Sequence, residues 1–227
     1  MAKKTTGSLS GIRLWLKRLV VASLALQVLF VIYFFFKVTA HMPDGNKTRI
    51  KLVIVLAVIA ALIFAYFRWG RKRPLLHRVV STAFRWLVYA HAAMLLYIFM
   101  LKWINPPITV TQFSSWVSGH GLKRDYVGYS NISSNAKLAV LAGEDQTFPD
   151  HNGFDWNAIK KSLNPPARKK NKKRKLPPGA GASTISQQVA KNVFLWQGKS
   201  YLRKGLEAYF TFMIENIWGK ERILDVY

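Results

Sequence analysis

Residues Glu144-Asp-Gln-Thr-Phe-Pro-Asp-His-Asn-Gly-Phe-Asp155 bring four acidic side chains, a histidine and a Phe-Pro break into twelve positions. The whole chain of 227 residues has only ten acidic residues against 34 lysines and arginines, a net charge of +24. Two explanations fit such a cluster. Either Asp155 caps a helix while Glu144 and Asp145 are simply exposed, or the stretch is half of an active site. We favour the second, with the other half further along the chain.

Helix signals surround this stretch on both sides. Ser133 or Ser134 is a suitable N-cap for a helix that ends near Glu144. The negative end of a helix dipole disfavours an ionised carboxylate, which suits a group that must accept a proton. Asp155 is placed to cap a second, short helix, whose apolar positions are Trp156, Ile159 and Leu163.

A third helix is predicted after Gly181. Thr184 and Gln187 fit a capping box at its start. One stripe of this helix is apolar and consists of Ile185, Val189 and Val193. Another is polar and consists of Thr184, Gln187, Gln188 and Lys191. A helix N-terminus with hydroxyls and a lysine suits a phosphate, although a merely solvated face fits the pattern equally well.

The last long helix begins after Ser200. Its predicted buried stripe is Leu202, Leu206, Tyr209, Met213 and Ile217. On another face Lys199, Arg203 and Glu207 recur every four residues. Arg203 and Glu207 also fit an ordinary surface ion pair, worth about 0.2–0.5 kcal/mol.

The first 105 residues are predicted to be a membrane region with three helical spans; the alternative is that the second and third form a re-entrant or interfacial pair. The uncharged runs are Leu19–Phe36, Leu52–Phe67 and Trp86–Leu101, of 18, 16 and 16 residues. Eleven basic residues flank them on one side, in the N-terminal tail and the second loop, against five on the other. The positive-inside rule then places the residues after Lys102 outside the cytoplasm, which disfavours a nucleic-acid partner.

The polar region 106–227 contains a basic segment at 164–182. Two Pro-Pro pairs bracket Arg168–Lys175, in which seven of eight residues are basic. We expect a mobile loop, either a solvated insertion or an electropositive flap near anionic lipid or a pyrophosphate. The chain has no cysteine, which excludes thiolate catalysis and zinc sites with cysteine ligands.

Taken together, these motifs resemble glycosyltransferase family 51, the peptidoglycan transglycosylases, and most closely the monofunctional biosynthetic type. The resemblance covers residues 106–227. It rests on Glu144–Asp155, Gly181-Ala-Ser-Thr-Ile-Ser-Gln-Gln188, Lys191-Asn192, Arg203-Lys-Gly-Leu-Glu207 and Lys220-Glu-Arg-Ile-Leu-Asp-Val-Tyr227. It implies an all-α, lysozyme-like domain on the outer face of a bacterial cytoplasmic membrane, acting in cell-wall biogenesis and cell shape.

The resemblance also implies a reaction and its partners. The 4-hydroxyl of an acceptor sugar attacks the anomeric carbon of the growing glycan strand with inversion, and undecaprenyl pyrophosphate leaves. Lipid II, the glycan strand and the membrane are the implied partners, with other cell-wall synthases as further candidates. A divalent cation such as Mg²⁺ is a candidate cofactor, and no organic cofactor is implied.

Site roles follow by matching the motifs. Glu144 is the implied general base, and Glu207 positions the pyrophosphate, with a divalent cation as a possible aid. Cations to neutralise the leaving group come from Lys191, Lys199 and Arg203, and Lys204 belongs to the implied substrate site. The implied substrate site also includes Asp145, Phe148, His151, Gly153, Ser183, Thr184, Gln187, Gln188 and Asn192. Among these, Asp145 and His151 are expected mainly to hold the turn.

The chain departs from the family pattern at several places, one of which is the unusual Pro-bracketed basic insertion Arg168–Lys175. Ala180 and Lys199 replace a basic residue and an arginine that the family commonly has, and the first two spans are extra. Family members continue past Tyr227 with Leu-Asn and a further helical lobe, so we expect the domain to be incomplete at its C-terminus. A lysozyme-like glycan hydrolase and an inactive membrane protein that binds lipid II are the alternative functions.

Overall fold

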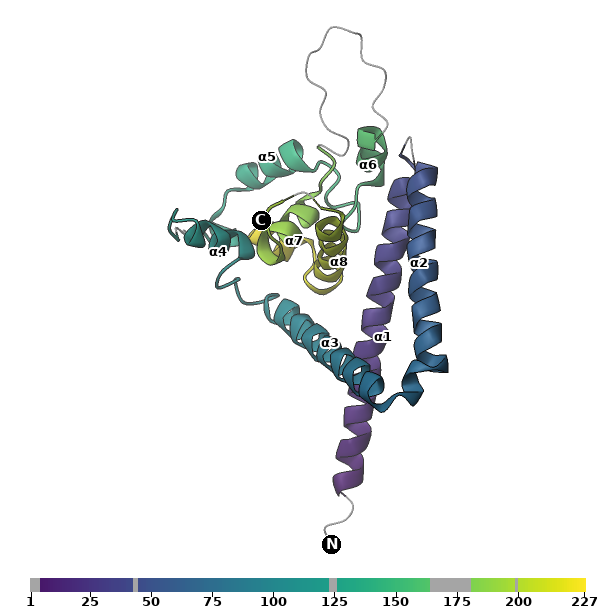
Figure 1. Cartoon of the computed structure of the whole chain (residues 1–227). Coiled ribbons are helices and arrows are strands. Elements are labelled where there is room, and N and C mark those ends of the chain that lie inside the picture. The colour runs from purple at the N-terminus through teal and green to yellow at the C-terminus, as the bar shows by residue number, and fades with distance from the viewer. Residues whose placement is uncertain (1–4, 43–44, 123–125, 164–180, 199) are drawn as a thin grey trace. The chain divides into compact units, whose positions relative to one another are not determined.

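The computed structural model describes residues 5–42, 45–122, 126–163, 181–198 and 200–227 (Figure 1). All regular elements in these ranges are helices, which confirms the all-α fold class. They are α1 (Thr5–Thr39), α2 (Gly45–Arg68), the 3-10 turn η1 (Gly70–Lys72), α3 (Pro74–Met100), α4 (Val110–Val117), the 3-10 turn η2 (Tyr129–Asn131), α5 (Ser134–Glu144), α6 (Trp156–Leu163), α7 (Ile185–Phe194), α8 (Tyr201–Ile217) and α9 (Lys220–Val226). Two compact units divide the chain, Met1–Ala40 with Asp44–Tyr97 and His41–Pro43 with Ile98–Tyr227.

The first unit is built from long apolar helices. Within the described residues, three are long and apolar enough to cross a membrane: Leu14–Thr39, Gly45–Lys72 and Pro74–Met100. Each overlaps one of the three predicted runs and extends it, so the prediction of three spans is confirmed by length and composition. Figure 1 shows α1 and α2 running antiparallel, side by side. Where they meet, Arg49 Nε donates a hydrogen bond of 3.4 Å to Thr39 Oγ1.

The turn between α2 and α3 is tight. A Cβ added at Gly70 would lie 3.0 Å from both Leu76 Cδ2 and Tyr66 Cδ2, so the turn leaves little room for a larger residue. The Tyr66 hydroxyl and His77 Nδ1 are 2.8 Å apart and join the two helices. Pro74 begins α3, a position where its missing N–H has no helical partner to lose.

The core of the second unit is formed by α7 and α8. The predicted apolar stripe of α7 is buried, with exposed fractions of 0%, 2% and 6% for Ile185, Val189 and Val193. Phe194, at the end of α7, stacks on Phe210 of α8 with ring centroids 4.6 Å apart. The sequence pattern therefore located the buried face of α7 correctly.

The predicted buried stripe of α8 was partly wrong. Met213 is buried, but Leu202 lies in the first turn and is 70% exposed. The buried residues of α8 are Gly205, Glu207, Ala208, Phe210, Thr211, Met213 and Ile214. Gly205 and Ala208 are buried although their side chains are small or absent. An apolar count alone overlooks this, because it weighs leucine above glycine and alanine.

The end of α3 belongs to the core of the second unit. Ile98 and Leu101 are 0% and 2% exposed. The Trp218 indole donates to the Ile98 carbonyl at 2.7 Å, and Arg222 Nη2 donates to the carbonyls of Leu101 and Ile104 at 2.9 Å each. The last carbonyls of a helix have no intrahelical donor. Trp218 satisfies one of them, and Arg222 binds carbonyls just past the helix end, so both tie the end of α3 to the residues around α9.

Replacing Trp218 tests this connection. We expect Trp218→Phe to leave the buried Ile98 carbonyl without its donor, at a cost of about 1–3 kcal/mol in the free energy of unfolding. Thermal unfolding of the detergent-solubilised chain, followed by circular dichroism, measures the change. Trp196→Phe is the matched control, because Trp196 is 44% exposed. Equal loss of Tm in the two variants would contradict the role assigned to Trp218.

Asp155 caps α6, as predicted. Its Oδ1 accepts the backbone N–H of Ala158 at 2.9 Å, and its Oδ2 accepts the Thr147 hydroxyl at 3.1 Å. Burial works against ionisation of this carboxyl. The backbone hydrogen bonds of the first turn, the Thr147 hydroxyl and the nearby His151 outweigh burial, and the pKa of Asp155 lies below its usual value.

The lowered pKa makes the cap pH-dependent. A carboxyl whose pKa falls on folding stabilises the protein above its unfolded pKa of about 3.9, and loses this contribution as the pH falls through the folded value. We expect the stability difference between wild type and Asp155→Asn, measured by thermal unfolding, to be present at pH 7 and to vanish at acidic pH. Asp150→Asn, in the exposed part of the same turn, should show no such difference. A pH-independent difference for Asp155→Asn would contradict the prediction.

Candidate active site

Glu144 is the last residue of α5. The N-cap of this helix is Ser133, whose hydroxyl accepts the N–H of Ala136 at 3.2 Å. Leu138, on this helix, is 61% exposed. Glu144 is exposed, and Gln188 Nε2 donates to its Oε2 at 2.9 Å. The helix thus presents an exposed carboxylate beside α7. A general base needs such access to the proton that it accepts.

Asp145 follows directly and has a different environment. It is 7% exposed and has one hydrogen-bond partner six residues away and another 40 residues away. His151 Nε2 lies 3.0 Å from Oδ1, and the N–H of Ile185, the first residue of α7, lies 3.0 Å from Oδ2. A carboxylate at a helix N-terminus is favoured by the helix dipole. Asp145 and His151 therefore hold the turn, as the sequence analysis expected.

Phe148 and Gly153 are also built into the protein interior. Phe148 is 2% exposed, with the Lys220 ammonium 4.5 Å from its ring centroid. Gly153 has φ +83° and approaches α8 so closely that a Cβ would lie 2.7 Å from Thr211 Cγ2. Lys220 Nζ further donates to the His151 carbonyl at 2.5 Å and to Glu215 at 2.8 Å. These contacts fix the turn from Asp145 to Gly153.

The capping box at the start of α7 is confirmed. The Thr184 hydroxyl accepts the Gln187 N–H at 3.2 Å, and Gln187 Oε1 accepts the Thr184 N–H at 3.1 Å. Both residues are 2% exposed, and the Thr184 hydroxyl also donates to the Gly153 carbonyl at 2.7 Å. The polar stripe is therefore not a uniformly solvated face. Gln188 and Lys191, further along it, are half-buried.

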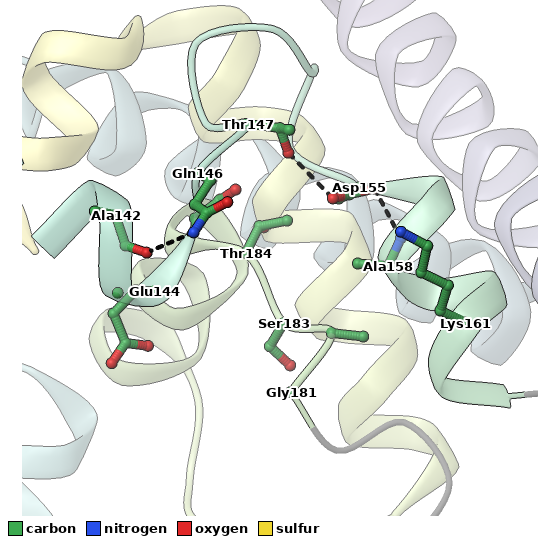
Figure 2. A pocket seen from close by; sticks show the side chains of 13 residues that line it. Ala142, Glu144, Gln146, Thr147, Asp155, Ala158, Lys161, Gly181, Ser183 and Thr184 are labelled. Atoms are coloured by element: carbon green, nitrogen blue, oxygen red, sulfur yellow. Dashed lines mark hydrogen bonds between the residues drawn. The ribbon is translucent and has the colours of Figure 1, made fainter. Parts of the chain in front are cut away.

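A pocket of about 370 Å³ opens beside Glu144. Figure 2 shows Glu144 at the end of α5, Lys161 of α6 across the pocket, and Ser183 between them. The lining residues are Ala142, Gly143, Glu144, Asp145, Gln146, Thr147, Asp155, Ala158, Lys161, Gly181, Ala182, Ser183 and Thr184. Four of the predicted site residues thus share one cavity. The sequence analysis gave no role to Lys161, because it lies among other surface lysines.

Glu207 lies within the core, on α8. It is 2% exposed, Arg203 Nη1 donates to its Oε2 at 2.7 Å, and Lys204 Nζ pairs with its Oε1. The cluster holds two cations and one carboxylate, so its net charge is +1. The Arg203–Glu207 pair is therefore not a surface ion pair, and removing either partner would leave a buried charge.

The metal expectation for Glu207 stays a prediction. Both oxygens of Glu207 already accept hydrogen bonds from cationic side chains. Within the part of the chain that the structure describes, no group of three His, Cys, Asp or Glu residues gathers to hold a metal ion. These residues do not fit a divalent cation bound by protein ligands alone, and no step below depends on one.

Two of the remaining predicted residues have different outcomes. Asn192 is exposed, and its backbone carbonyl accepts the Thr111 hydroxyl at 3.0 Å. Lys199 lies outside the described residues, as does most of the basic segment 164–182.

Tyr227 is a residue at the site to which the sequence analysis gave no role. Its hydroxyl lies 3.4 Å from Gln188 Oε1, on the side of the amide away from Glu144. Burial, and then the negative charge of Glu144, raise the pKa of the Tyr227 phenol. The sequence signal that could have found it is its position at the end of the motif Lys220–Tyr227.

Comparison with known proteins finds a matching family model and similar curated relatives. A family model described as Transglycosylase matches residues 110–227. The chain is 43% identical over 159 residues to a biosynthetic peptidoglycan transglycosylase of Pseudomonas aeruginosa, an alignment that covers 67% of this chain and 66% of the relative. Relatives with the same description from Pseudomonas savastanoi pv. phaseolicola and Pseudomonas putida strain GB-1 are each 45% identical, covering 67% and 68% of this chain and 63% and 64% of the relatives.

The alignments cover only part of each relative. The chain spans just under two thirds of the length of these curated relatives. No solved structure matches the chain. The family model nevertheless covers the whole of α4 to α9, including Glu144, the α7 capping box and the Glu207 cluster. With more than half of its residues matched, the chain belongs to the transglycosylase family.

Proposed function

We propose that the protein is a peptidoglycan glycosyltransferase that polymerises glycan strands from lipid II. The observation that carries the proposal is the position of Glu144, an exposed carboxylate at the end of α5 that lines the pocket with Ser183 and Thr184. Membership of the transglycosylase family and the printed names of the relatives support the peptidoglycan substrate.

The reaction needs one proton acceptor at the attacking hydroxyl. In the proposed mechanism, Glu144 takes the proton of the 4-hydroxyl on the acceptor sugar as that oxygen bonds to the anomeric carbon of the donor. The bond from the anomeric carbon to the pyrophosphate oxygen breaks, and undecaprenyl pyrophosphate leaves with the bonding electrons. The configuration at the anomeric carbon is inverted.

The leaving group then needs positive charge where its negative charge develops. Lys191 is half-buried on α7, three residues beyond Gln188, and the Arg203–Lys204–Glu207 cluster on α8 has a net positive charge. The packing of α7 against α8 brings both elements into one unit. We assign Lys191 and this cluster to the pyrophosphate.

The environment of Glu207 separates this proposal from a lysozyme-like hydrolase. A glycosidase needs a second carboxyl group that acts as an acid or nucleophile beside the sugar. Glu207 is 2% exposed and is paired with Arg203 and Lys204, so it is poorly placed for either role. One exposed base near cationic side chains suits a displacement that expels pyrophosphate.

The apolar helices and the peptidoglycan relatives fit a bacterial membrane protein. We further propose that the second unit acts on the outer face of the membrane. The support is the distribution of basic residues, eleven on the side of the N-terminal tail and the second loop against five on the other.

Incubation with labelled lipid II tests the proposed activity. We expect the protein, reconstituted in vesicles together with the C-terminal lobe that family members have, to form glycan polymer, and Glu144→Gln to lower kcat by about 10²–10⁴-fold because no group accepts the hydroxyl proton. Glu221→Gln is the matched control, since Glu221 is exposed on α9. Release of soluble fragments from preformed glycan would instead support the hydrolase. Binding of lipid II without polymer, in wild type as in Glu144→Gln, would support the non-enzymatic alternative.

A second variant tests the leaving-group site. We expect Lys191→Met to lower kcat by about 10²-fold, because one cation that stabilises the departing pyrophosphate is lost. Lys160→Met on the exposed side of α6 is the control. If the two variants polymerise lipid II at the same rate, Lys191 has no part in expelling the pyrophosphate.

A further inference from the structure

We infer that Gln188 and Tyr227 are positioning residues that orient the Glu144 carboxylate for proton transfer. The three side chains form a short chain of hydrogen bonds across three helical elements. Tyr227 lies 3.4 Å from Gln188 Oε1, and Gln188 Nε2 lies 2.9 Å from Glu144 Oε2. The inference rests on the proposed function, since it concerns the group assigned as the base.

The direction of these hydrogen bonds is set by chemistry. An ionised carboxylate only accepts, so the Gln188 side chain must turn its NH₂ group toward Glu144. Its carbonyl oxygen then faces away and requires a donor, which the Tyr227 hydroxyl supplies. Without that hydroxyl, the amide would lose its preference for one of two orientations. In the reverse orientation it would place an oxygen against the carboxylate.

Tyr227 remains a donor throughout the neutral pH range. Its pKa lies above the usual value of about 10, raised by burial and by the charge of Glu144. The phenol is therefore protonated wherever a general base of this type operates. This agrees with a hydroxyl that orients the amide and does not itself take part in proton transfer.

The backbones that carry the three side chains are fixed relative to one another. Glu144 is bonded to Asp145, whose carboxylate accepts the first N–H of α7 at 3.0 Å, and Gln188 lies in the first turn of that helix. Tyr227 lies one turn beyond Ile223, which is fully buried, and its N–H donates to the Ile223 carbonyl at 3.1 Å. The alignment of these three hydrogen-bonded side chains thus comes from the core of the unit.

The consequence concerns the oxygen that reacts. Within the described residues, Gln188 donates to Oε2 of Glu144, and Oε1 is the oxygen that remains to accept the substrate proton. Holding one oxygen restricts the rotation of the carboxylate. A carboxylate that is already oriented loses less rotational freedom on reaching the reactive geometry, and this lowers the entropic part of the barrier.

Kinetics of the full chain in vesicles test the inference. We expect Gln188→Met to lower kcat by about 10- to 100-fold and Tyr227→Phe by about three- to tenfold, with KM for lipid II nearly unchanged. The matched controls are Gln197→Met, on the turn before α8, and Tyr201→Phe, at the start of α8. Both residues are exposed, so the kcat of each control should stay within about twofold of wild type. A rise in KM at constant kcat would overturn the inference and assign Gln188 to substrate binding.

A spectroscopic readout tests the same inference without turnover. The chain contains four glutamates, Glu144, Glu207, Glu215 and Glu221, so selective ¹³C labelling of glutamate carboxyls gives four signals, and Glu144→Gln identifies one of them. We expect the Glu144 signal to move in both Gln188→Met and Tyr227→Phe while the other three stay in place. An unmoved Glu144 signal in both variants would overturn the inference.

The two readouts also separate this inference from the proposed function. If wild type forms no polymer but the Glu144 signal responds to Tyr227→Phe, the proposed function fails and the positioning stands. If wild type polymerises lipid II, loses activity in Glu144→Gln and is unaffected by Gln188→Met and Tyr227→Phe, the function stands and the positioning fails.

Discussion

The buried carboxylate of Asp145 is the interaction on which the site depends. It joins the end of α5 to His151, six residues away in the same turn, and to the first N–H of α7, 40 residues away. Because each is a hydrogen bond to a charged group in a buried place, losing either leaves an expensive unpaired acceptor. Glu144, the adjacent residue, is thereby held at a fixed distance from α7. The position of the exposed acid follows from the burial of its neighbour.

Features that depend on local sequence could be predicted. The N-cap at Ser133, the cap at Asp155 and the capping box of Thr184 and Gln187 are all present. Each depends on residues no more than four positions apart, so the pattern contains all the information needed. The three long apolar runs were found for a similar reason, because composition over about 20 residues decides whether a helix can cross a bilayer.

Features that depend on distant contacts could not be predicted. The sequence pattern made Leu202 part of a buried stripe, yet this residue is 70% exposed. It also left open whether Glu207 and Arg203 form a surface pair, whereas Glu207 is 2% exposed. Tyr227 and Lys161 acquire a place at the site only through packing. The prediction of the site rests on motifs that resemble a known family, and physical periodicity alone would have left it ambiguous.

The partners of the acids support the choice of Glu144 as the proposed base. In the described part of the second unit, Glu207, Glu215 and Asp225 are each paired with lysine or arginine, and Asp145 is paired with His151. Protonating any of them would break an ion pair or a buried contact. Asp155 is occupied by its helix cap. Glu144 instead accepts a hydrogen bond from a neutral amide at Oε2. When Oε1 takes up a proton, Oε2 becomes the carbonyl oxygen of the acid and still accepts this hydrogen bond. A protonated Glu144 therefore keeps its hydrogen bond and loses no ion pair, so its charge can change in each catalytic cycle at little cost to the fold.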